Sequence, residues 1–372
     1  MKKKRVLHFF GCMNRGGAET LIINLYNHIN RDAIQFDFVV QCNYKGEYDD
    51  LIESFGGRIF KLPTHKNLNL YIKELKKILI NHGPYEVCHS HVFFFSGLNL
   101  LIAKKCGVPI RIAHSHTVNV GQNNTIIRSL YHNLMRLLIK KNATIMLGCS
   151  NEACFSLYGK NYFKDKRVAV FKNAIDTDKF TSIQNYSIQN ELGLSTDTKI
   201  VGHVGRFTSA KNHEKIIKVF VELLKLNDQI HLVLVGEGET KEQIVTMCKQ
   251  HHIDGKIHFL GVRNDIPRLM KGFDAFLFPS HFEGLGLVLI EAQATGTPCL
   301  VSAQIPDEAD LGLGLFKKVS LQESDKSWAE KLYKLFYHPK IDEENIVISL
   351  ESSGYGIDTS VKDLMKYYKA GD

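Results

Sequence analysis

Short runs of apolar residues alternate along the chain with longer segments whose apolar residues recur every three or four positions. The short runs predict β-strands, and the longer segments predict amphipathic helices. In the first half, strands are predicted at 6–10, 36–40, 110–113, 144–147 and 168–171, and helices at 18–29, 71–80 and 126–140. Because continuously apolar strands alternate with helices, we expect a parallel sheet that is covered on both faces.

The second half of the chain repeats this scheme. Strands are predicted at 200–204, 230–235, 257–260, 275–278 and 298–301, and helices near 212–226, 239–251 and 286–295. Two such series predict an α/β fold with two doubly wound, Rossmann-like domains that face a cleft. The polar stretch from Asp176 to Ser195 is the predicted linker. Ligands of such domains bind at the carboxyl ends of the strands, so the loops that follow strands are expected to carry the chemistry.

Composition agrees with two globular domains and adds an uneven charge. The 372 residues are 44% hydrophobic, and no biased segment indicates a fibrous or disordered protein. The net charge of +8 divides into +13 through residue 190 and −5 after it, and 101–150 holds seven basic and no acidic residues. This balance allows a nucleotide, a nucleic acid or an anionic membrane as partner without choosing among them.

The cysteines and the N-terminus predict a cytoplasmic protein. Eight cysteines are scattered without a CxxC pair, which favours buried free thiols in a reducing compartment. Basic residues precede the first apolar run, as in a signal peptide, but the run ends at Asn14 and Arg15 without a small-residue cleavage site. No window approaches the roughly 18 apolar residues of a membrane span. We expect a cytoplasmic chain that can rest on the inner face of the plasma membrane.

A glycine-rich loop follows the first predicted strand. It contains Gly11, Gly16 and Gly17 and leads into a helix. Glycines let the backbone approach a ligand closely, and a helix N-terminus favours an anion. The loop lacks the GxGxxG pattern of dinucleotide-binding proteins, and a tight turn without a ligand is the alternative interpretation.

Two cations follow the strand at 200–204. Arg206 and Lys211 lie in the loop at the carboxyl end of that strand. An arginine fork and a lysine point charge together suit a diphosphate. The alternative is a pair of solvated loop charges.

A second loop, after the strand at 275–278, combines glycines with carboxylates. Gly284 and Gly286 precede a helix whose N-terminus can receive a phosphate. Glu283 lies in the loop and Glu291 lies more than a turn into the helix, and each can accept hydrogen bonds from sugar or ribose hydroxyls. A capping carboxylate is the alternative for Glu283.

These motifs resemble a known family. Glu283 and Glu291 form an E-x7-E pair, and with Arg206, Lys211 and the 16–19 loop they are similar to the retaining GT-B glycosyltransferases of family 4, especially members that build bacterial exopolysaccharide or capsule. The resemblance covers nearly the whole chain, and 278–292 is its most specific part. It implies an acceptor-binding domain at 1–180, a nucleotide-sugar-binding domain at 181–350, and a C-terminal helix within 351–372 that packs back on the first domain.

The resemblance also implies an activity. It is the transfer of a hexosyl or N-acetylhexosaminyl group (EC 2.4) from a nucleotide diphosphate sugar, a UDP-sugar in preference to a GDP-sugar, to a carbohydrate on a lipid-linked acceptor. Arg206 and Lys211 would hold the diphosphate, Glu291 the ribose and Glu283 the transferred sugar, without a metal ion. The implied nucleotide-sugar-binding residues are Gly16, Gly17, Arg206, Lys211, Val262, Glu283, Gly284, Leu285, Gly286, Leu287 and Glu291, and the implied catalytic residues are His116, Glu283, Arg206 and Lys211.

Two His-Ser-His triplets, at 89–91 and 114–116, follow apolar runs. Such pairs can bind zinc, but no cysteine or carboxylate completes a site, and hydrogen-bonded histidines at strand ends are the alternative. We expect no metal. By the resemblance, His116 lies near the reacting sugar and His91 lies on the acceptor side. Asp176, Thr177 and Asp178 imitate a metal-binding DxD, but their place in the linker favours a turn.

The predicted helix at 126–141 is amphipathic and basic. Ile127, Leu130, Leu134, Leu137 and Leu138 share one face, which we expect to pack on the core. The other face carries Arg128, His132, Arg136 and Lys140, and it can rest on anionic lipid.

Two other classes of protein are compatible with the composition. A nucleotide-sugar epimerase on the same fold would convert its donor without an acceptor. A non-enzymatic nucleic-acid binder would use the basic first half, but its basic residues are not interleaved with aromatic stacking residues.

Overall fold

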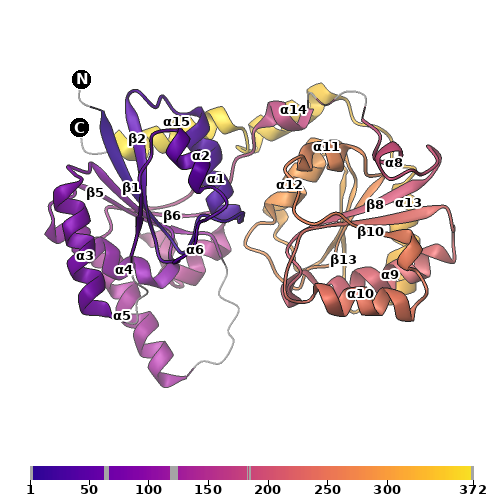
Figure 1. Ribbon diagram of the computed structural model, residues 1–372, viewed down its shortest axis with the longest axis horizontal. Coiled ribbons are helices and arrows are strands. Elements are labelled where there is room, and N and C mark those ends of the chain that lie inside the picture. Colours follow the sequence, from indigo (N-terminus) through magenta and orange to yellow (C-terminus); the bar gives the residue numbers. More distant parts are fainter. Residues whose placement is uncertain (1–2, 63–66, 118–124, 182, 184–185, 370–372) are drawn as a thin grey trace. The chain divides into compact units, whose positions relative to one another are not determined.

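A computed structural model describes residues 3–62, 67–117, 125–181, 183 and 186–369 (Figure 1). The chain forms two units, each with its own parallel sheet and hydrophobic core. Unit 1 comprises Met1–Ile175 and Gly354–Asp372, and unit 2 comprises Asp176–Ser353. The boundary therefore lies at Asp176, where the predicted linker begins.

Unit 1 contains a seven-stranded parallel sheet in the order β3-β2-β1-β4-β5-β6-β7. Helices α1 and α15 cover one face, and α3, α4 and α5 cover the other (Figure 1). Its strands are β1 (Lys4–Phe10), β2 (Ile34–Val40), β3 (Ile59–Lys61), β4 (Val87–Ser90), β5 (Ile110–Ser115), β6 (Ile145–Gly148) and β7 (Val168–Val170). Its α-helices are α1 (Gly17–His28), α2 (Asp49–Ser54), α3 (Leu68–Asn81), α4 (Ser96–Lys105), α5 (Ile126–Asn142), α6 (Asn151–Tyr158) and α15 (Ile357–Lys369), and short 3-10 turns lie at Phe93–Phe95 and Tyr162–Lys164.

Unit 2 contains a six-stranded parallel sheet in the order β10-β9-β8-β11-β12-β13. Helices α9, α10 and α13 cover one face, and α11 and α12 lie on the other (Figure 1). Its strands are β8 (Lys199–Val204), β9 (Ile230–Val235), β10 (Ile257–Phe259), β11 (Ala275–Phe278), β12 (Cys299–Ser302) and β13 (Phe316–Val319). Its α-helices are α7 (Thr177–Thr181), α8 (Ile188–Glu191), α9 (His213–Leu224), α10 (Lys241–Gln250), α11 (Ile266–Lys271), α12 (Leu287–Ala294), α13 (Asp325–Leu335) and α14 (Glu343–Ser352), with 3-10 turns at Ser209–Lys211, Asp254–Lys256 and Asp307–Ala309.

The predicted strands are all present, with ends within two residues of the prediction. Strands β3 and β13 were not predicted, and β4 was expected only as a short apolar strand before His89. Each has three or four residues, and polar side chains interrupt its apolar pattern. Both sheets reverse their strand order next to the first strand, between β1 and β4 in unit 1 and between β8 and β11 in unit 2. These are topological switch points, where open α/β sheets bind their ligands.

The chain leaves unit 1 and returns to it through neighbouring segments. The Ile175 amide donates to the Tyr355 carbonyl at 3.0 Å, and Ile175 forms a parallel bridge with Gly356. Helix α15 then packs on the sheet, where Leu364 and Tyr368 join the core cluster of α1. The C-terminal segment is therefore an integral part of unit 1.

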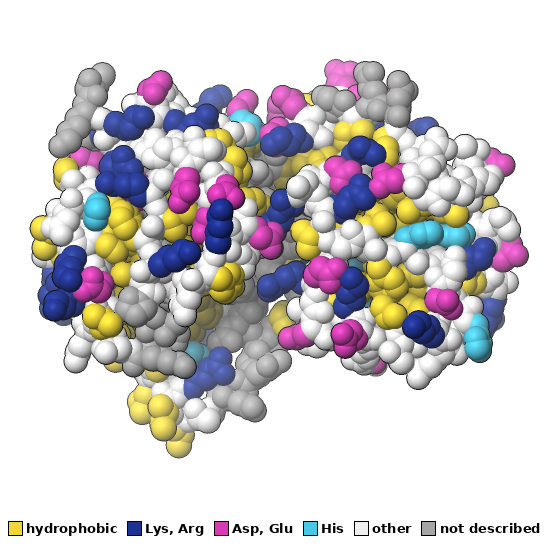
Figure 2. Space-filling view, viewed as in Figure 1, with side chains coloured by type: hydrophobic (Ala, Val, Ile, Leu, Met, Phe, Trp, Pro, Cys, Tyr) yellow, Lys and Arg dark blue, Asp and Glu magenta, His cyan; other side chains and the backbone are white. Residues whose placement is uncertain are grey.

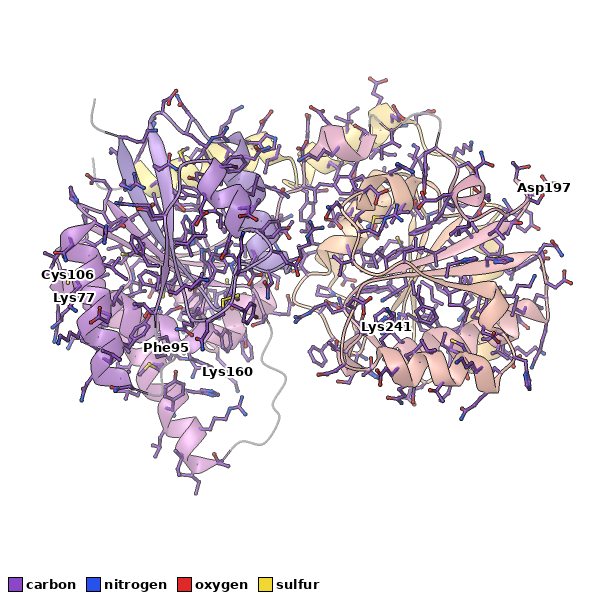
Figure 3. All side chains as sticks on the ribbon, viewed as in Figure 1. Lys77, Phe95, Cys106, Lys160, Asp197 and Lys241 are labelled. Carbon is purple, nitrogen blue, oxygen red and sulfur yellow. A yellow bond between two sulfur atoms is a disulfide. The ribbon has the colours of Figure 1, made fainter. Side chains whose placement is uncertain are left out.

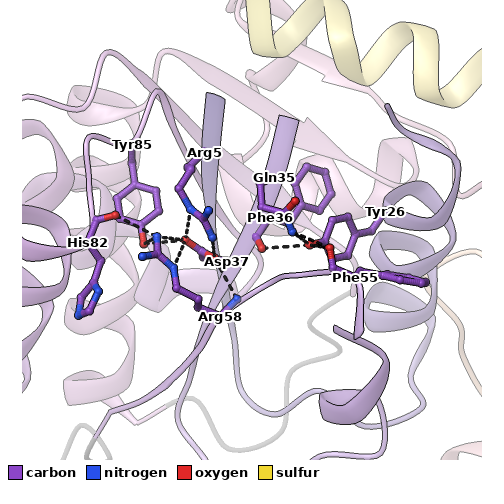
Figure 4. Close-up of polar contacts among 9 residues, drawn as sticks. All are labelled: Arg5, Tyr26, Gln35, Phe36, Asp37, Phe55, Arg58, His82 and Tyr85. Atoms are coloured by element: carbon purple, nitrogen blue, oxygen red, sulfur yellow. Dashed lines mark hydrogen bonds and ion pairs between the residues drawn. The ribbon is translucent and has the colours of Figure 1, made fainter. Parts of the chain in front are cut away.

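A buried carboxylate ties the first strands of unit 1 together (Figure 4). Asp37 on β2 is fully buried, and it accepts hydrogen bonds from Arg5 Nε at 2.8 Å, Arg58 Nε at 3.1 Å and the Tyr85 hydroxyl at 2.9 Å. Desolvation opposes ionisation, but the two guanidinium groups outweigh it, and the pKa of Asp37 is lowered. Because its partners are all satisfied within the core, we interpret this cluster as structural.

The expectation that all eight cysteines are free thiols is wrong for one pair. Cys12 and Cys42 form a disulfide, drawn as a yellow bond in Figure 3. Phe10 at the end of β1 lies opposite Val40 at the end of β2, so each cysteine lies two residues beyond a paired position. Their Cα atoms are thereby brought to 5.4 Å, within the range for a disulfide. The other six cysteines are free, as predicted.

Within the described residues, no helix combines the length and the apolar character that a membrane span requires.

Candidate active site

The switch point of unit 2 brings Lys211 and Glu283 together. Lys211 ends the loop after β8, and Glu283 lies in the loop after β11, which is the neighbouring strand. Nζ of Lys211 lies 2.7 Å from Oε1 of Glu283, and 4.7 Å from the centre of the Phe278 ring. Both charged side chains are largely shielded, with 19% and 15% of their surface exposed. The ion pair is therefore partly shielded from water, and the charge interaction is stronger there than in bulk water.

Backbone hydrogen bonds hold the two loops in this arrangement. The His281 amide donates to the Ala210 carbonyl at 2.9 Å, and the Asn212 side-chain amide donates to the Pro279 carbonyl at 3.0 Å. The N-cap residue of helix α12 is Gly286, so no N-cap side chain caps this helix. The carboxylate of Glu283 pairs with Lys211.

Arg206 lies on the same loop and is exposed. Within the described part of the chain, it has no carboxylate partner. The next residue, Phe207, is fully buried and its amide donates to the Glu237 carbonyl at 3.0 Å, which anchors the loop beside the guanidinium group. Arg206 is thus an exposed cation on an anchored loop at the edge of the sheet.

Two glycines in the loop after β9, which the sequence indicates as another loop at this sheet edge, permit this packing. Gly236 has a φ of +137°, and a Cβ there would lie 2.1 Å from the Gly205 carbonyl oxygen. Gly238 has a φ of +156°, and its Cβ would lie 2.4 Å from the Phe207 oxygen. Only glycine fits such close backbone contacts, so the loops after β8 and β9 depend on both residues.

Helix α12 presents its N-terminus and Glu291 to the same edge. Gly286 precedes the helix in the left-handed region with a φ of +83°, and the first amide groups of an α-helix have no acceptor within the helix. Glu291 is half-buried, and burial raises its pKa to about 7. Gln293 donates to the Leu289 and Ala309 carbonyls at 2.9 and 2.7 Å and fixes the helix from its buried side.

The remaining predicted residues of unit 2 line the same loops. Leu285 is buried, whereas Gly284 and Leu287 are half-buried. Val262 follows β10, and 53% of its surface is exposed. This apolar surface is suited to contact with a flat ring. Beside it, Glu237 pairs with Lys241 at the start of α10, a residue labelled in Figure 3.

In unit 1, Gly16 and Gly17 lie after β1, at the switch point of that sheet. Gly16 precedes α1, and a Cβ there would lie 2.4 Å from the Glu19 carboxylate oxygen, whereas Gly17 has open space around it. His91 follows β4 on the other side of the same switch point. The two predicted sites of unit 1 therefore share one sheet edge.

The four histidines of the two triplets form hydrogen-bonded pairs. His91 Nδ1 lies 2.8 Å from His116 Nε2, and His89 Nε2 lies 3.2 Å from His114 Nδ1. Burial lowers the pKa of His116 to about 3, so its imidazole is neutral at pH 7. His8 on β1 and Tyr368 on α15 extend these pairs, and the sequence analysis missed both residues. Elsewhere, Asp176 pairs with Lys179 at 2.8 Å at the start of α7, as expected of a turn.

The prediction for the amphipathic helix, α5, is wrong about its faces. Its buried residues are Met135, Ile139 and Asn142, and the predicted core face points to solvent over most of its length. Figure 2 shows hydrophobic side chains gathered at the N-terminal end of this helix. The exposed apolar residues are Ile126, Ile127, Leu130, Tyr131, Leu134 and Leu137, with 41–81% of their surface exposed.

Two Rossmann-like parallel sheets, each with a topological switch point, are the architecture of the GT-B class of glycosyltransferases. Comparison with solved structures agrees. A crystal structure of Anabaena Alr3699/HepE in complex with UDP and glucose aligns with a TM-score of 0.77 over 99% of this chain and 100% of that chain, at 16% identity. This similarity shows the fold.

Sequence comparison narrows the class. The model "Glycosyltransferase Family 4" matches residues 15–179, and "Glycosyl transferases group 1" matches residues 185–343. The putative glycosyltransferase EpsF of Bacillus subtilis (strain 168) is 34% identical over 98% of this chain and 96% of its own length. The chain belongs to glycosyltransferase family 4, in its exopolysaccharide and capsule branch, as the resemblance indicated.

Two further relatives are similar at lower identity. The capsular polysaccharide biosynthesis glycosyltransferase CapH of Staphylococcus aureus is 28% identical over 98% of both chains. An Escherichia coli UDP-Gal:alpha-D-GlcNAc-diphosphoundecaprenol alpha-1,3-galactosyltransferase is 28% identical over 72% of both. The chain is therefore a glycosyltransferase (EC 2.4) of polysaccharide or capsule synthesis.

Proposed function

We propose that this glycosyltransferase moves a sugar from a UDP-sugar to a hydroxyl group of a lipid-linked oligosaccharide, with retention of the anomeric configuration. The observation that carries the proposal is the cluster at the switch point of unit 2, where Arg206, Lys211, Glu283 and the start of α12 meet. It combines cations for a diphosphate with a carboxylate for sugar hydroxyls.

The ion pair suits a shared task on the donor. An ammonium group has three donors, and one of those of Lys211 is directed at Oε1 of Glu283. The other donors can reach phosphate oxygens, while Oε2 of Glu283 can accept from a sugar hydroxyl. When the bond to the sugar breaks, negative charge develops on the diphosphate, and Arg206, Lys211 and the first amides of α12 stabilise it. These groups supply the positive charge, so the proposed transfer needs no metal ion.

In this proposal, Glu291 binds the ribose. A carboxylate accepts hydrogen bonds from both hydroxyls of a ribose, and these bonds favour its charged form. Since burial raises the pKa of Glu291 to about 7 in the unliganded protein, nucleotide binding should lower that pKa and strengthen as the pH rises through 7.

His116 acts in this proposal as a hydrogen-bonding group. With a pKa of about 3 it does not take a proton at neutral pH. The acceptor hydroxyl would then lose its proton to an oxygen of the leaving diphosphate, on the face where the new bond forms. His91, hydrogen-bonded to His116, would lie on the acceptor side.

The lipid-linked acceptor is proposed from two observations. The Escherichia coli relative is named for a diphosphoundecaprenol-linked substrate. In this chain, the exposed apolar face of α5 ends near Lys140 and Lys141, in a region without acidic residues. An amphipathic helix of this kind lies in a membrane interface with its apolar side chains among the acyl chains and its basic ones at anionic headgroups. We propose that α5 docks unit 1 on the membrane by its apolar face.

A panel of nucleotide sugars tests the proposal. A UDP-sugar should raise the melting temperature, and the same UDP-sugar should donate its sugar to a polyprenyl diphosphate-linked saccharide. Conversion of the donor without acceptor would identify an epimerase instead. Stabilisation by GDP-sugars alone would refute the proposed donor.

A further inference from the structure

Five histidines and one tyrosine form a continuous hydrogen-bonded chain inside unit 1. It runs His116–His91–His8–Tyr368–His89–His114. The successive separations are 2.8 Å (His116 Nε2 to His91 Nδ1), 3.1 Å (His91 Nε2 to His8 Nδ1), 3.4 Å (His8 Nε2 to the Tyr368 hydroxyl), 2.9 Å (that hydroxyl to His89 Nδ1) and 3.2 Å (His89 Nε2 to His114 Nδ1).

The sheet and one helix build this chain. Strand β4 lies between β1 and β5 in the sheet, and His8 on β1 lies directly opposite His89 on β4. Alternate residues of a strand share a face, so His91 and His116 lie on the same face as His89 and His114. Helix α15 covers that face and inserts Tyr368 between His8 and His89.

A metal ion is the obvious alternative, and the geometry disfavours it. His91 belongs to two possible ligand triads, one with His8 and His89 and the other with His114 and His116. The His91 and His116 ring centres are 5.1 Å apart, and the His8 and His91 centres are 5.4 Å apart. Each distance between ring centres exceeds the corresponding N···N distance by about two ring radii. The two nitrogens of each pair therefore point at one another, as in a hydrogen bond, and not at a shared metal ion.

All five imidazole rings of the hydrogen-bonded chain are neutral at pH 7. Burial lowers the pKa of His8 and His116 to about 3, and it holds the pKa of His89, His91 and His114 well below 6.5. Asp37 on β2 acts on His8 in the opposite direction, more weakly than burial does. Each neutral imidazole then contributes one N–H, and Tyr368 one O–H.

The proton count restricts the chain to two arrangements. Six protons serve five hydrogen bonds. If the Tyr368 oxygen accepted from both His8 and His89, its own proton would be left as an unpaired buried O–H, which is costly. The Tyr368 hydroxyl therefore donates to one of these rings, and the spare proton lies at an end, on His116 Nδ1 or on His114 Nε2.

Neither end atom has a partner among the described residues. His114 is 0% exposed, whereas His116 is half-buried. Both end nitrogens are buried, but the His116 ring reaches the surface whereas the His114 ring does not. A small movement of the His116 ring lets water pair with an N–H there, while an N–H on His114 would stay unpaired, so we place the extra proton on His116.

We propose that Tyr368 is a positioning residue, whose hydroxyl couples the two arms of the chain and thereby fixes all five histidines as Nδ1–H tautomers. His116 then offers an N–H donor, and not a lone pair, at the end of the chain. Without the Tyr368 hydroxyl, the hydrogen bonds of His8, His91 and His116 are no longer coupled to the buried end at His114. Their direction, and with it the tautomer of each ring, can then reverse. The catalytic relevance of His116 rests on the proposed function, whereas the tautomers do not.

Two-bond ¹H–¹⁵N spectra of the full chain with ¹⁵N-labelled histidine test this directly, because they distinguish the two tautomers and the imidazolium ion. The wild type should show Nδ1–H patterns for His8, His89, His91, His114 and His116, unchanged from pH 6 to pH 8. Tyr368→Phe should give mixed or reversed tautomers for His8, His91 and His116. Tyr367→Phe, which removes a hydroxyl from the neighbouring position of the same helix, should leave the pattern unchanged.

A second variant protects the test against misfolding. His114→Phe removes the buried end of the chain from another strand, and it should release the tautomer of His116 in the same way. Nε2–H patterns in the wild type, titration of these rings between pH 6 and pH 8, or unchanged spectra in both variants would overturn the proposal. So would stoichiometric binding of added Zn²⁺ that shifts the five signals together, which would identify a metal site.

Activity measurements distinguish a failure of the hydrogen-bonded chain from a failure of the proposed function. Tyr368→Phe should lower kcat by roughly 10- to 100-fold and change the donor KM by less than about twofold, because it misorients a group on the acceptor side. If the tautomers follow the expected pattern while Tyr368→Phe and His116→Ala both transfer sugar at the wild-type rate, the chain stands and the role of His116 in transfer fails.

Discussion

Nζ of Lys211 lies 2.7 Å from Oε1 of Glu283, although 72 residues separate them in the sequence. The two side chains come from the loops on either side of the switch point of unit 2. One charge is suited to a phosphate and the other to a sugar hydroxyl, and each fixes the position of its partner.

Removal of either member should therefore damage transfer. We expect Lys211→Ala and Glu283→Gln each to lower kcat/KM by about 10²- to 10³-fold. Because the residues act as a unit, the double variant should lose much less than the product of the two losses. Lys241→Ala, which breaks the Lys241–Glu237 pair at the same sheet edge, is the matched control and should stay near wild type. Wild-type turnover in Glu283→Gln would refute the site assignment.

Glu291 should make the protein less stable as the pH rises. Its pKa is about 7 in the folded state and 4.5 ordinarily, so the folded state binds the proton more tightly than the unfolded state. The resulting stabilisation is complete below pH 4.5 and is lost as the pH rises through 7. Glu291→Gln should accordingly be more stable than wild type by about 1–3 kcal/mol at pH 8, and equally stable near pH 4.5.

Denaturant unfolding at the two pH values measures this difference. The same variant should lose nucleotide-dependent stabilisation, since an amide replaces the carboxylate that accepts from the ribose. Equal stability of the two proteins at pH 8 would show that the carboxyl group is solvated and not perturbed.

Gly236 should tolerate no side chain. Its φ of +137° and the 2.1 Å approach of a Cβ to the Gly205 oxygen force the loop after β8 to move. Gly236→Ala should cost at least about 1–3 kcal/mol of unfolding free energy and weaken UDP binding, because Arg206 lies on the displaced loop. Gly255→Ala, at a position where a Cβ meets no atom within 4 Å, is the control. Unchanged stability and UDP affinity in Gly236→Ala would contradict this account of the loops.

Helix α5 should carry the membrane affinity in its exposed leucines. Replacing Leu130 and Leu134 with serine should abolish flotation with anionic vesicles, whereas Ile348→Ser, which removes an exposed apolar side chain from unit 2, should not. Lys140→Glu with Lys141→Glu should weaken flotation and make it less sensitive to salt. Flotation that survives the leucine substitutions would place the membrane contact elsewhere or exclude it.

Apolar periodicity predicted most strands of both sheets, because buried parallel strands and amphipathic helices have distinct patterns. It also predicted the Lys211 and Glu283 loops, since each follows a strongly apolar strand. It failed for α5, because a helix whose apolar stripe faces solvent has the same pattern as one that packs on a core.

Contacts that depend on the order of the strands could not be predicted from the sequence. Cys12 meets Cys42 only because β1 and β2 are paired, and Tyr368 reaches His89 across 279 positions only because α15 returns to unit 1. The spacing of His8 relative to the apolar residues of β1 was a usable signal, since it places a polar side chain on a core-facing position. The sequence shows Gly236 and Gly238 directly after a predicted strand, but the need for glycine at Gly236 arises from its contact with the neighbouring loop.

The most direct test of the central claim is the anomeric configuration of the product. A UDP-sugar of known configuration and a polyprenyl diphosphate-linked acceptor would be incubated with the full chain, and the new linkage read from its ¹H NMR coupling constant. We predict the same anomeric configuration in product and donor, with no product from Glu283→Gln. An inverted linkage, or conversion of the UDP-sugar without any acceptor, would contradict the account.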